Sequence, residues 1–257
     1  MTKKKTGTRE WAEKNINIMT GCEHACRYCY AAEMALKRFH RIAALDEWAN
    51  PQLRLKEVAK KRRKVKGRIM FPTTHDITPQ FLDACVTVLK KLLAAGNDVL
   101  IVTKPHLECV ERLCRDLAAY KEKIVFRFTI GAMDDDLLRF WEPGAPSFAE
   151  RLAALKHAHA EGFRTSVSAE PMLDVPHAVE LYETLVPFIT DTVWFGKMND
   201  VRRRVDANTE QEKAAVKRIE DNQTDERIIA LYERLKDKPK IEWKDSFKKI
   251  VGLAAAE

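Results

Sequence analysis

The chain has 257 residues, of which 46% are hydrophobic and 32% are charged, an ordinary composition for a globular protein with a sizeable core. No apolar run approaches the roughly 20 residues that cross a bilayer. The first ten residues lack the apolar stretch of a secretory signal. Composition therefore argues against a membrane-spanning or secreted protein, and we expect a cytoplasmic chain with no membrane partner.

Segments rich in Val, Ile, Phe and Thr alternate with helical patterns from about residue 15 to residue 200. The expected strands are 15–20, 68–73, 98–103, 124–130, 164–169 and 191–196. The expected helices are 31–39, 79–96, 106–120, 147–162 and 176–188. This alternation predicts parallel strands joined by crossover helices, with fewer units than the eight of a full barrel. The predicted fold class is α/β, a partial (β/α)6 TIM-like barrel with a helical C-terminal extension.

Two regions depart from the alternation. Residues 39–67 are too many for a simple connection, and we expect an insertion that holds a basic helix. From residue 207 the pattern is helical, except for a short stretch near 240–243. The sequence therefore predicts a barrel domain over residues 1–206 and a helical extension over 207–257.

Positive charge is concentrated in the insertion. The segment RLKEVAKKRRKVKGR at 54–68 holds nine basic residues against one acid, whereas the whole chain has a net charge of +7. The rest of the chain thus has a slight excess of acids. A local basic run predicts a polyanionic partner such as nucleic acid, and the alternative is a solvated face that serves solubility. The residues expected to bind the partner are Lys60, Lys61, Arg62, Arg63 and Lys64.

Three cysteines form the strongest chemical pattern in the sequence. Cys22, Cys26 and Cys29 are spaced C-x3-C-x2-C on the loop after the first expected strand. Three thiolates on one loop predict a [4Fe–4S] cluster with one iron left open, at the strand end where barrels build active sites. The alternative is a zinc site completed by His24 or His40, in a non-catalytic nucleic-acid-binding module. The other cysteines are expected in the core: Cys85, Cys109 and Cys114.

The motif C-x3-C-x-Tyr-C after a first strand resembles the signature of the radical S-adenosylmethionine (SAM) superfamily, over roughly residues 12–200. The resemblance implies that the amino and carboxylate groups of SAM chelate the open iron. One electron from a flavodoxin- or ferredoxin-type donor would then cleave SAM to methionine and a 5′-deoxyadenosyl radical, which abstracts hydrogen from a substrate. A peptide or small-molecule substrate is the alternative to nucleic acid.

Within the superfamily the chain is similar to the spore photoproduct lyase branch. The residues that carry this likeness are Tyr28, Tyr30, Thr103, Lys104, the strand 127–130, Glu142, Gly144, Ala145, Pro146, Ser147 and Arg151. The likeness implies that Thr129 contacts SAM, that Tyr30 relays a hydrogen atom, and that nucleic acid is the substrate. The lyases carry a cysteine as hydrogen donor on the second-strand loop, where this chain reads PTTHDITP.

Polar residues at the ends of the expected strands complete the predicted site. Ser168 and Glu170 share one face of their strand, as Arg127 and Thr129 do on the strand before it. Polar groups inside a small barrel must be paired or contact a ligand, so an internal Arg127–Glu170 ion pair is the alternative to ligand binding. The expected catalytic residues are Tyr30, Lys104 and Glu170. The expected cofactor-binding residues are Tyr28, Thr73, Thr74, His75, Asp76, Arg127, Thr129, Ser168, Lys197 and Asn199.

Several of these residues have a structural alternative. The loop Thr73 to Asp76 would lie near the SAM amino group by the resemblance, but Thr and Asp also cap helices and form turns. Lys104 would bind a carboxylate or phosphate, or close a strand end. Lys197 and Asn199 would flank the adenosine or the substrate.

Overall fold

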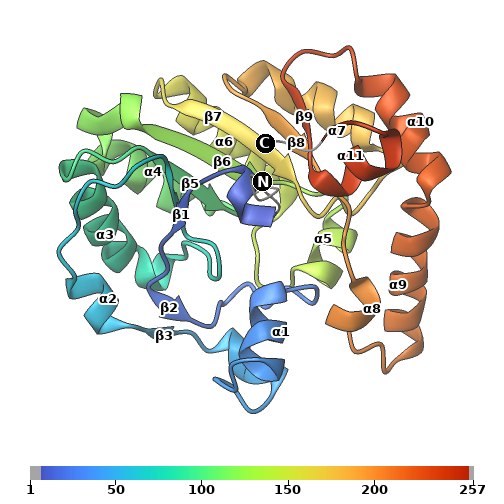
Figure 1. Ribbon diagram of the computed structural model, residues 1–257, viewed down its shortest axis with the longest axis horizontal. Helices are drawn as coiled ribbons and strands as arrows, with labels where there is room; N and C mark the ends of the chain where they lie inside the picture. Colours follow the sequence, from blue (N-terminus) through green and yellow to red (C-terminus); the bar gives the residue numbers. More distant parts are fainter. Residues whose placement is uncertain (1–6, 255–257) are drawn as a thin grey trace.

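A seven-stranded parallel sheet forms the centre of the computed structural model, which describes residues 7–254 (Figure 1). Its strands, in spatial order, are β1 (Lys14–Asn15), β4 (Ile69–Phe71), β5 (Val99–Thr103), β6 (Ile124–Thr129), β7 (Arg164–Ala169), β8 (Val193–Phe195) and β9 (Ile241–Trp243). Every neighbouring pair is parallel, and spatial order follows chain order. This arrangement confirms the predicted α/β class, and its strand order is that of a partial barrel.

Helices connect the strands and cover the sheet. They are α1 (Tyr30–Lys37), α3 (Leu82–Ala94), α4 (Leu107–Asp116), α5 (Asp135–Trp141), α6 (Phe148–Ala160) and α7 (Ala178–Leu185). Short 3₁₀ helices are η1 (Gly7–Glu10), η2 (Leu45–Ala49), η3 (Pro79–Phe81), η4 (Ala118–Lys123) and η5 (Val186–Phe188). Among the described residues, none of the helices combines the length and the apolar character that crossing a bilayer requires.

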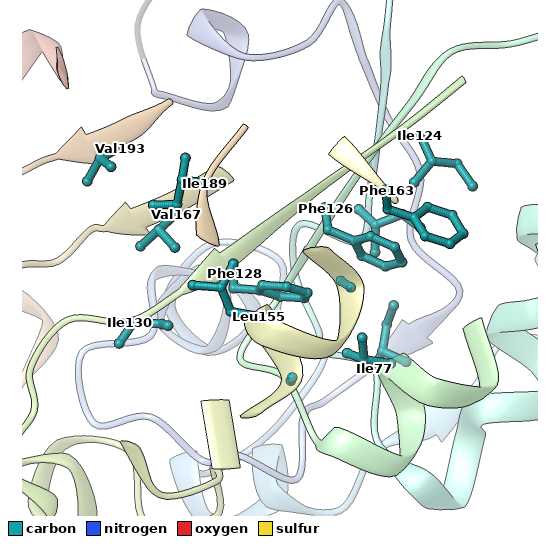
Figure 2. Packing of buried hydrophobic residues seen from close by; sticks show 14 of the residues in the cluster. Ile77, Ile124, Phe126, Phe128, Ile130, Leu155, Phe163, Val167, Ile189 and Val193 are labelled. Atoms are coloured by element: carbon teal, nitrogen blue, oxygen red, sulfur yellow. The ribbon is translucent and has the colours of Figure 1, made fainter. Parts of the chain in front are cut away.

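The main core lies between the sheet and the helices α3, α4, α6 and α7 (Figure 2). Alternation along β6 and just beyond it places Phe126, Phe128 and Ile130 on this side, each fully buried. The ring of Phe126 lies 5.3 Å from that of Phe163, which begins the approach to β7. Burying a side chain of this size stabilises the folded state by about 1.5–3 kcal/mol relative to leaving it exposed. The three cysteines expected in the core are buried here: Cys85, Cys109 and Cys114.

The first expected strand, 15–20, is two short strands in the structure. β1 pairs with β4, whereas β2 (Met19–Thr20) pairs antiparallel with β3 (Gln52–Leu53) in a separate two-stranded sheet. Asn17 lies between them, and its Oδ1 accepts hydrogen bonds from the backbone N–H groups of Thr73 and Thr74 at 2.7 and 2.9 Å. The N–H of the next residue, Ile18, donates to Nε2 of His75 at 3.0 Å. Because these bonds replace strand pairing, the backbone leaves the main sheet after β1.

The prediction of a basic helix in the insertion is wrong. The helix α2 (Leu55–Ala59) has five residues and ends before the run of Lys and Arg, which continues without regular structure. Asn97, at the end of α3, binds the backbone of this run: its Oδ1 accepts from the N–H of Val65 at 2.9 Å and its Nδ2 donates to the carbonyl of Arg63 at 3.2 Å. Like charges four residues apart, as at Lys60 and Lys64, also disfavour a helix.

The C-terminal segment is helical and also contributes to the central sheet. It comprises α8 (Val201–Arg204), α9 (Glu210–Asn222), α10 (Asp225–Leu235), the strand β9 and α11 (Asp245–Val251). The short stretch expected near 240–243 is the strand β9, which pairs with β8. Trp243 stacks 5.0 Å from Phe247 and joins the main core. The division of the chain at residue 206 stays a prediction.

Candidate active site

The three clustered cysteines lie on the loop between β2 and α1, at the lower part of Figure 1. All three are free thiols and half-buried. The loop turns tightly, with Ala25 at φ 45° and its N–H bonded to the carbonyl of Cys22 at 3.2 Å. Cys29 directly precedes the first turn of α1, and its N–H donates to the carbonyl of Cys26 at 3.0 Å. The backbone therefore gathers three thiols within one short loop.

Each of the three thiols has a raised pKa. Burial raises the pKa of Cys22 well above its usual value, and the charges of Asp76, Cys26 and Cys29 raise it further. Burial likewise raises the pKa of Cys26 to about 12, with Lys104 opposing the increase. Burial also raises the pKa of Cys29. Metal binding removes such thiol protons outright.

The donor set fits a [4Fe–4S] cluster better than a single zinc ion. Within residues 7–254, no three His, Cys, Asp or Glu side chains converge on one point suited to a single metal ion. A cube does not require such convergence, because each thiolate binds a different iron. Both ring nitrogens of His24 are engaged, Nδ1 at 3.1 Å from Asp76 and Nε2 at 3.1 Å from His106. His24 therefore has no nitrogen to offer as the fourth ligand of the zinc alternative.

The loop that follows α5 packs directly against the cysteine loop. The N–H of Gly144 donates to the carbonyl of His24 at 3.1 Å. A Cβ atom at Gly144 would lie only 2.1 Å from the carbonyl oxygen of Glu23. Glycine is therefore required at position 144 for two backbones to approach this closely.

Arg27 links the cysteine loop to two helices through hydrogen bonds and an ion pair. Its backbone N–H donates to the carbonyl of Trp141 at 2.9 Å, and its Nε donates to the carbonyl of Phe140 at 2.8 Å, both in α5. Its Nη1 lies 2.9 Å from Glu212 in the first turn of α9. The C-terminal segment thus helps to hold the predicted cluster loop.

A buried ion pair supports the same region. Arg151 Nη2 lies 2.6 Å from Glu142 Oε2, and both side chains are fully buried. The hydroxyl of Tyr28 donates to the other carboxylate oxygen of Glu142. Burial alone would raise the pKa of Glu142, but Arg151 and Lys104 lower it overall. Arg151 Nη1 also donates to the carbonyl of Thr129 at 3.3 Å, so the pair links the cysteine loop to the end of β6.

Asp76 organises the loop after β4. Its carboxylate accepts hydrogen bonds from the hydroxyl of Thr103 and, at 3.0 Å, from the N–H of Lys104. Burial would raise its pKa, yet the neighbouring His24 and Lys104 lower it overall. The Lys104 ammonium lies 5.8 Å from the centre of the Tyr28 ring. Burial disfavours its charge, but Cys26, Glu142 and Asp76 raise its pKa, so Lys104 remains a cation beside the cysteines.

His75 is fully engaged by the protein backbone. Its Nε2 accepts from the N–H of Ile18 at 3.0 Å, and its Nδ1 lies 3.0 Å from the carbonyl of Asp76. Burial lowers the pKa of His75 to about 4 from an ordinary 6.5. The neutral imidazole therefore serves to join the β2 segment to the loop after β4.

This low pKa predicts a pH dependence of stability. Below pH 6.5 His75 takes up a proton in the unfolded chain but stays neutral in the folded protein. The free energy of unfolding should therefore fall by roughly 1.4 kcal/mol per pH unit down to about pH 4. A His75→Gln variant should show a shallower loss over the same interval. Urea denaturation of both proteins at pH 7, 6 and 5 measures the slopes, and equal slopes would contradict the assignment.

The residues facing into the barrel lie in two layers. The hydroxyls of Thr129 and Ser168, on neighbouring strands, are buried and 3.5 Å apart. Arg127, two residues earlier on β6, donates to the hydroxyl of Ser166 at 3.0 Å, and its guanidinium lies 4.6 Å from the Trp11 ring. Arg127 therefore lies further than Thr129 from the carboxyl ends of the strands.

Glu170 has a partner that sequence reasoning missed. Its carboxylate lies 3.5 Å from the ammonium of Lys244, which follows β9, rather than pairing with Arg127. Lys244 also lies 2.8 Å from Glu10. Burial raises the pKa of Glu170, and Lys244 opposes that increase. No sequence signal marks Lys244, because its neighbours are distant in the chain.

Lys197 and Asn199 lie beside the C-terminal segment. The ammonium of Lys197 is 3.7 Å from Asp225 of α10, and Asn199 is exposed. Gln223 at the end of α9 joins two strand ends here, since it accepts from the N–H of Met198 at 2.9 Å and donates to the carbonyl of Met172 at 2.6 Å. The cofactor roles expected for Lys197 and Asn199 stay predictions.

Comparisons with known proteins show which family this chain resembles. A model of the radical SAM superfamily matches residues 16–175. Uncharacterized protein ORF301 of Acidianus two-tailed virus is 28% identical over 172 residues, which cover 63% of this chain and 56% of that protein. Uncharacterized protein MJ0683 of Methanocaldococcus jannaschii is 27% identical over 163 residues, covering 62% of this chain and 60% of the other. The chain thus spans less than two thirds of either relative's length.

Solved radical SAM structures share the fold. A substituted form of spore photoproduct lyase has a TM-score of 0.55 at 18% identity, covering 89% of this chain and 75% of that chain. Another form, with bound AdoMet and dinucleoside spore photoproduct, has a TM-score of 0.55 at 16% identity and the same coverage. Streptococcus suis SuiB bound to S-adenosylmethionine has a TM-score of 0.50 at 13% identity, covering 88% and 45%. At such identities these likenesses concern the fold alone. Because the family model spans more than half of the chain, this protein belongs to the radical SAM superfamily, whose enzymes use a [4Fe–4S] cluster and SAM.

Proposed function

We propose that this protein cleaves SAM reductively at a [4Fe–4S] cluster held by Cys22, Cys26 and Cys29, and that the reaction abstracts hydrogen from a nucleic acid. The observation that carries the cleavage step is the gathering of three unbridged thiols on one loop, with the cationic Lys104 beside Cys26. When bound, the cluster and SAM supply one electron from an external donor and an adenosine-derived radical, which takes a hydrogen atom and leaves as 5′-deoxyadenosine.

The residues of this chain bind and orient the reactants. We assign Lys104 to the SAM carboxylate, because its ammonium stays charged in a half-buried position next to Cys26. We assign the paired hydroxyls of Thr129 and Ser168 to polar groups of the adenosine, since buried hydroxyls 3.5 Å apart retain unused hydrogen-bonding capacity. We assign Glu170, whose carboxylate contacts Lys244, to accept hydrogen bonds from a ribose or from the substrate.

Tyr30 is the residue that we assign to hydrogen relay. It follows Cys29 directly, and its hydroxyl donates to the carbonyl of Thr73 at 2.7 Å. Burial raises its pKa to about 12, with the charge of Cys29 adding to the increase, so the phenol keeps its hydrogen at neutral pH. A Tyr30→Phe variant should still cleave SAM but should release less substrate product for each 5′-deoxyadenosine.

The basic segment supports a nucleic-acid substrate. An open cavity of about 550 Å³, which we call the basic groove, runs along β1, the edge strand of the sheet. It is lined by Arg54 and the run from Lys60 to Arg63. Lys61 and Arg63 are exposed, and within residues 7–254 neither side chain has a hydrogen bond or ion pair. Cations without protein partners are available to phosphates. The spore photoproduct lyase structure that contains a dinucleoside photoproduct gives this substrate class a precedent on the same fold.

Deuterium transfer tests the proposed reaction. The holoenzyme is reduced with dithionite in the presence of SAM and a fully deuterated single-stranded or duplex oligonucleotide, and 5′-deoxyadenosine is analysed by mass spectrometry. We expect deuterium in the product only when the deuterated strand is present. Formation of 5′-deoxyadenosine without deuterium from any oligonucleotide would retain the superfamily chemistry and would favour a peptide or small-molecule substrate instead.

Salt dependence tests the basic groove. Reversing two charges in a Lys61→Glu/Arg63→Glu variant should weaken oligonucleotide binding and reduce the slope of log affinity against log salt by roughly 1.4–1.8, since each phosphate contact contributes about 0.7–0.9. The matched control, Lys238→Glu/Arg218→Glu, reverses two exposed charges on the C-terminal segment. Fluorescence anisotropy at several salt concentrations measures both slopes, and equal slopes would contradict a role for the groove.

A further inference from the structure

A second, smaller cavity lies between α1 and the segment that contains β2, η2 and β3. Its volume is about 140 Å³, and it adjoins the basic groove because Asn17 and Arg54 line both spaces. Tyr30, the residue after Cys29, lines it from the side of the predicted cluster. The cavity therefore adjoins both the basic groove and the residue that follows the cysteine loop.

Two buried donors at this cavity have no partner. Trp48 is only 5% exposed, and its indole Nε1–H makes no hydrogen bond within residues 7–254. The Nε–H of Arg54 is also buried and unpaired in the described part of the chain. Native proteins pair the large majority of buried polar groups. Trp48 and Arg54 both line this cavity, so a ligand with hydrogen-bond acceptors bound there would offer partners to the two donors.

An exposed aromatic ring borders the same space. Phe39 lines the cavity and is 46% exposed, which is unusual for so large an apolar side chain. The guanidinium of Arg41 lies 4.9 Å from the centre of its ring. Aromatic rings and guanidinium planes are the surfaces on which unstacked bases stack.

We propose that this cavity receives one unstacked base of a single-stranded nucleic acid whose phosphates lie along the basic groove. The inference rests on the proposed nucleic-acid substrate and adds the site that holds the base. The cavity is smaller than the roughly 300–1,000 Å³ of sites for drug-sized ligands, so it suits a single ring system. The ring stacks on Phe39, its acceptors meet the Trp48 and Arg54 donors, and the adjoining phosphate meets the groove.

Separating base contacts from phosphate contacts tests this assignment. A labelled 12-nucleotide single strand, and a strand of the same length made of abasic sites, are titrated with the holoenzyme at several salt concentrations. Phe39→Ala should weaken binding of the normal strand about ten-fold without changing the salt slope, because base stacking is insensitive to salt. Trp48→Phe keeps an aromatic ring but removes the N–H together with the rest of the pyrrole ring, and it should weaken binding about five-fold. Neither variant should change binding of the abasic strand.

A control variant and three possible outcomes decide whether the base site exists. Ile229→Ala removes an equally exposed apolar side chain on α10, 44% exposed, and should bind both strands as the wild type does. Equal weakening of the normal and abasic strands would overturn the base site. Wild-type binding by Phe39→Ala and Trp48→Phe, together with weak binding by Lys61→Glu/Arg63→Glu, would overturn the base site and leave the nucleic-acid substrate standing. Absence of binding by any strand at low salt would overturn both, while SAM cleavage is measured independently of either.

Discussion

Replacing Arg151 with methionine should lower the free energy of unfolding by about 3–5 kcal/mol, because the carboxylate of Glu142 would be left buried without its countercharge. In the native protein the two charged groups are 2.6 Å apart and neither side chain is exposed. Arg151 also donates to the carbonyls of Pro146 and Thr129, which would lose their partners. Urea denaturation at pH 7 measures the change.

Two comparisons isolate the cause of this loss. In a double variant, Glu142→Gln with Arg151→Met, no charge is left unpaired and most of the stability should return. Arg139 forms an ion pair with Asp136, but both side chains are largely exposed, so Arg139→Met should change stability far less. If Arg151→Met stays within about 1 kcal/mol of the wild type, the range of exposed pairs, the buried pair does not stabilise the fold.

An alanine at position 144 should prevent normal loading of the iron–sulfur cluster. The added methyl group would lie 2.1 Å from the carbonyl oxygen of Glu23, between Cys22 and Cys26, so one of the two backbones must move. Overpacking of this kind costs about 1–3 kcal/mol, and the cysteine loop lies directly at the point of contact. We expect iron and sulfide content after anaerobic reconstitution to fall below half of the wild-type level.

A second glycine separates lost stability from a displaced loop. Gly252 follows α11 at φ +72°, and apart from its own chain neighbours no atom of residues 7–254 lies within 4 Å of an added Cβ. Gly252→Ala should therefore lose some stability through backbone strain but should load iron fully. Full loading and an unchanged absorbance spectrum in Gly144→Ala would show that the contact between these loops does not position the cysteines.

The features that could be predicted from the sequence depend on local patterns. Alternating apolar residues predict the parallel strands, since period and composition lie within each segment. The spacing of Cys22, Cys26 and Cys29 predicts the metal-binding loop because all three ligands lie within eight residues. The parallel strands are confirmed, and the cysteine ligands stay a prediction; neither prediction requires knowledge of distant parts of the chain.

The features that could not be predicted depend on contacts between distant segments. The strand expected over 15–20 divides because Asn17 binds the loop after β4, 56 residues away. The basic run is not helical because Asn97 binds its backbone from the end of α3. Lys244 reaches Glu10 and Glu170 only once β9 has joined the sheet. A sequence lists such residues but does not show which of them meet.

Iron analysis combined with SAM cleavage tests the central claim most directly. The wild type, Cys26→Ala and a core-cysteine control, Cys85→Ala, are purified and reconstituted anaerobically, analysed for iron and sulfide, and incubated with dithionite and SAM. We predict about four irons per chain and formation of 5′-deoxyadenosine by the wild type and by Cys85→Ala, whose thiol is buried in the core. Cys26→Ala should show neither. A colourless wild-type protein that holds zinc and leaves SAM intact would contradict the assignment of the cysteine loop as a radical SAM centre.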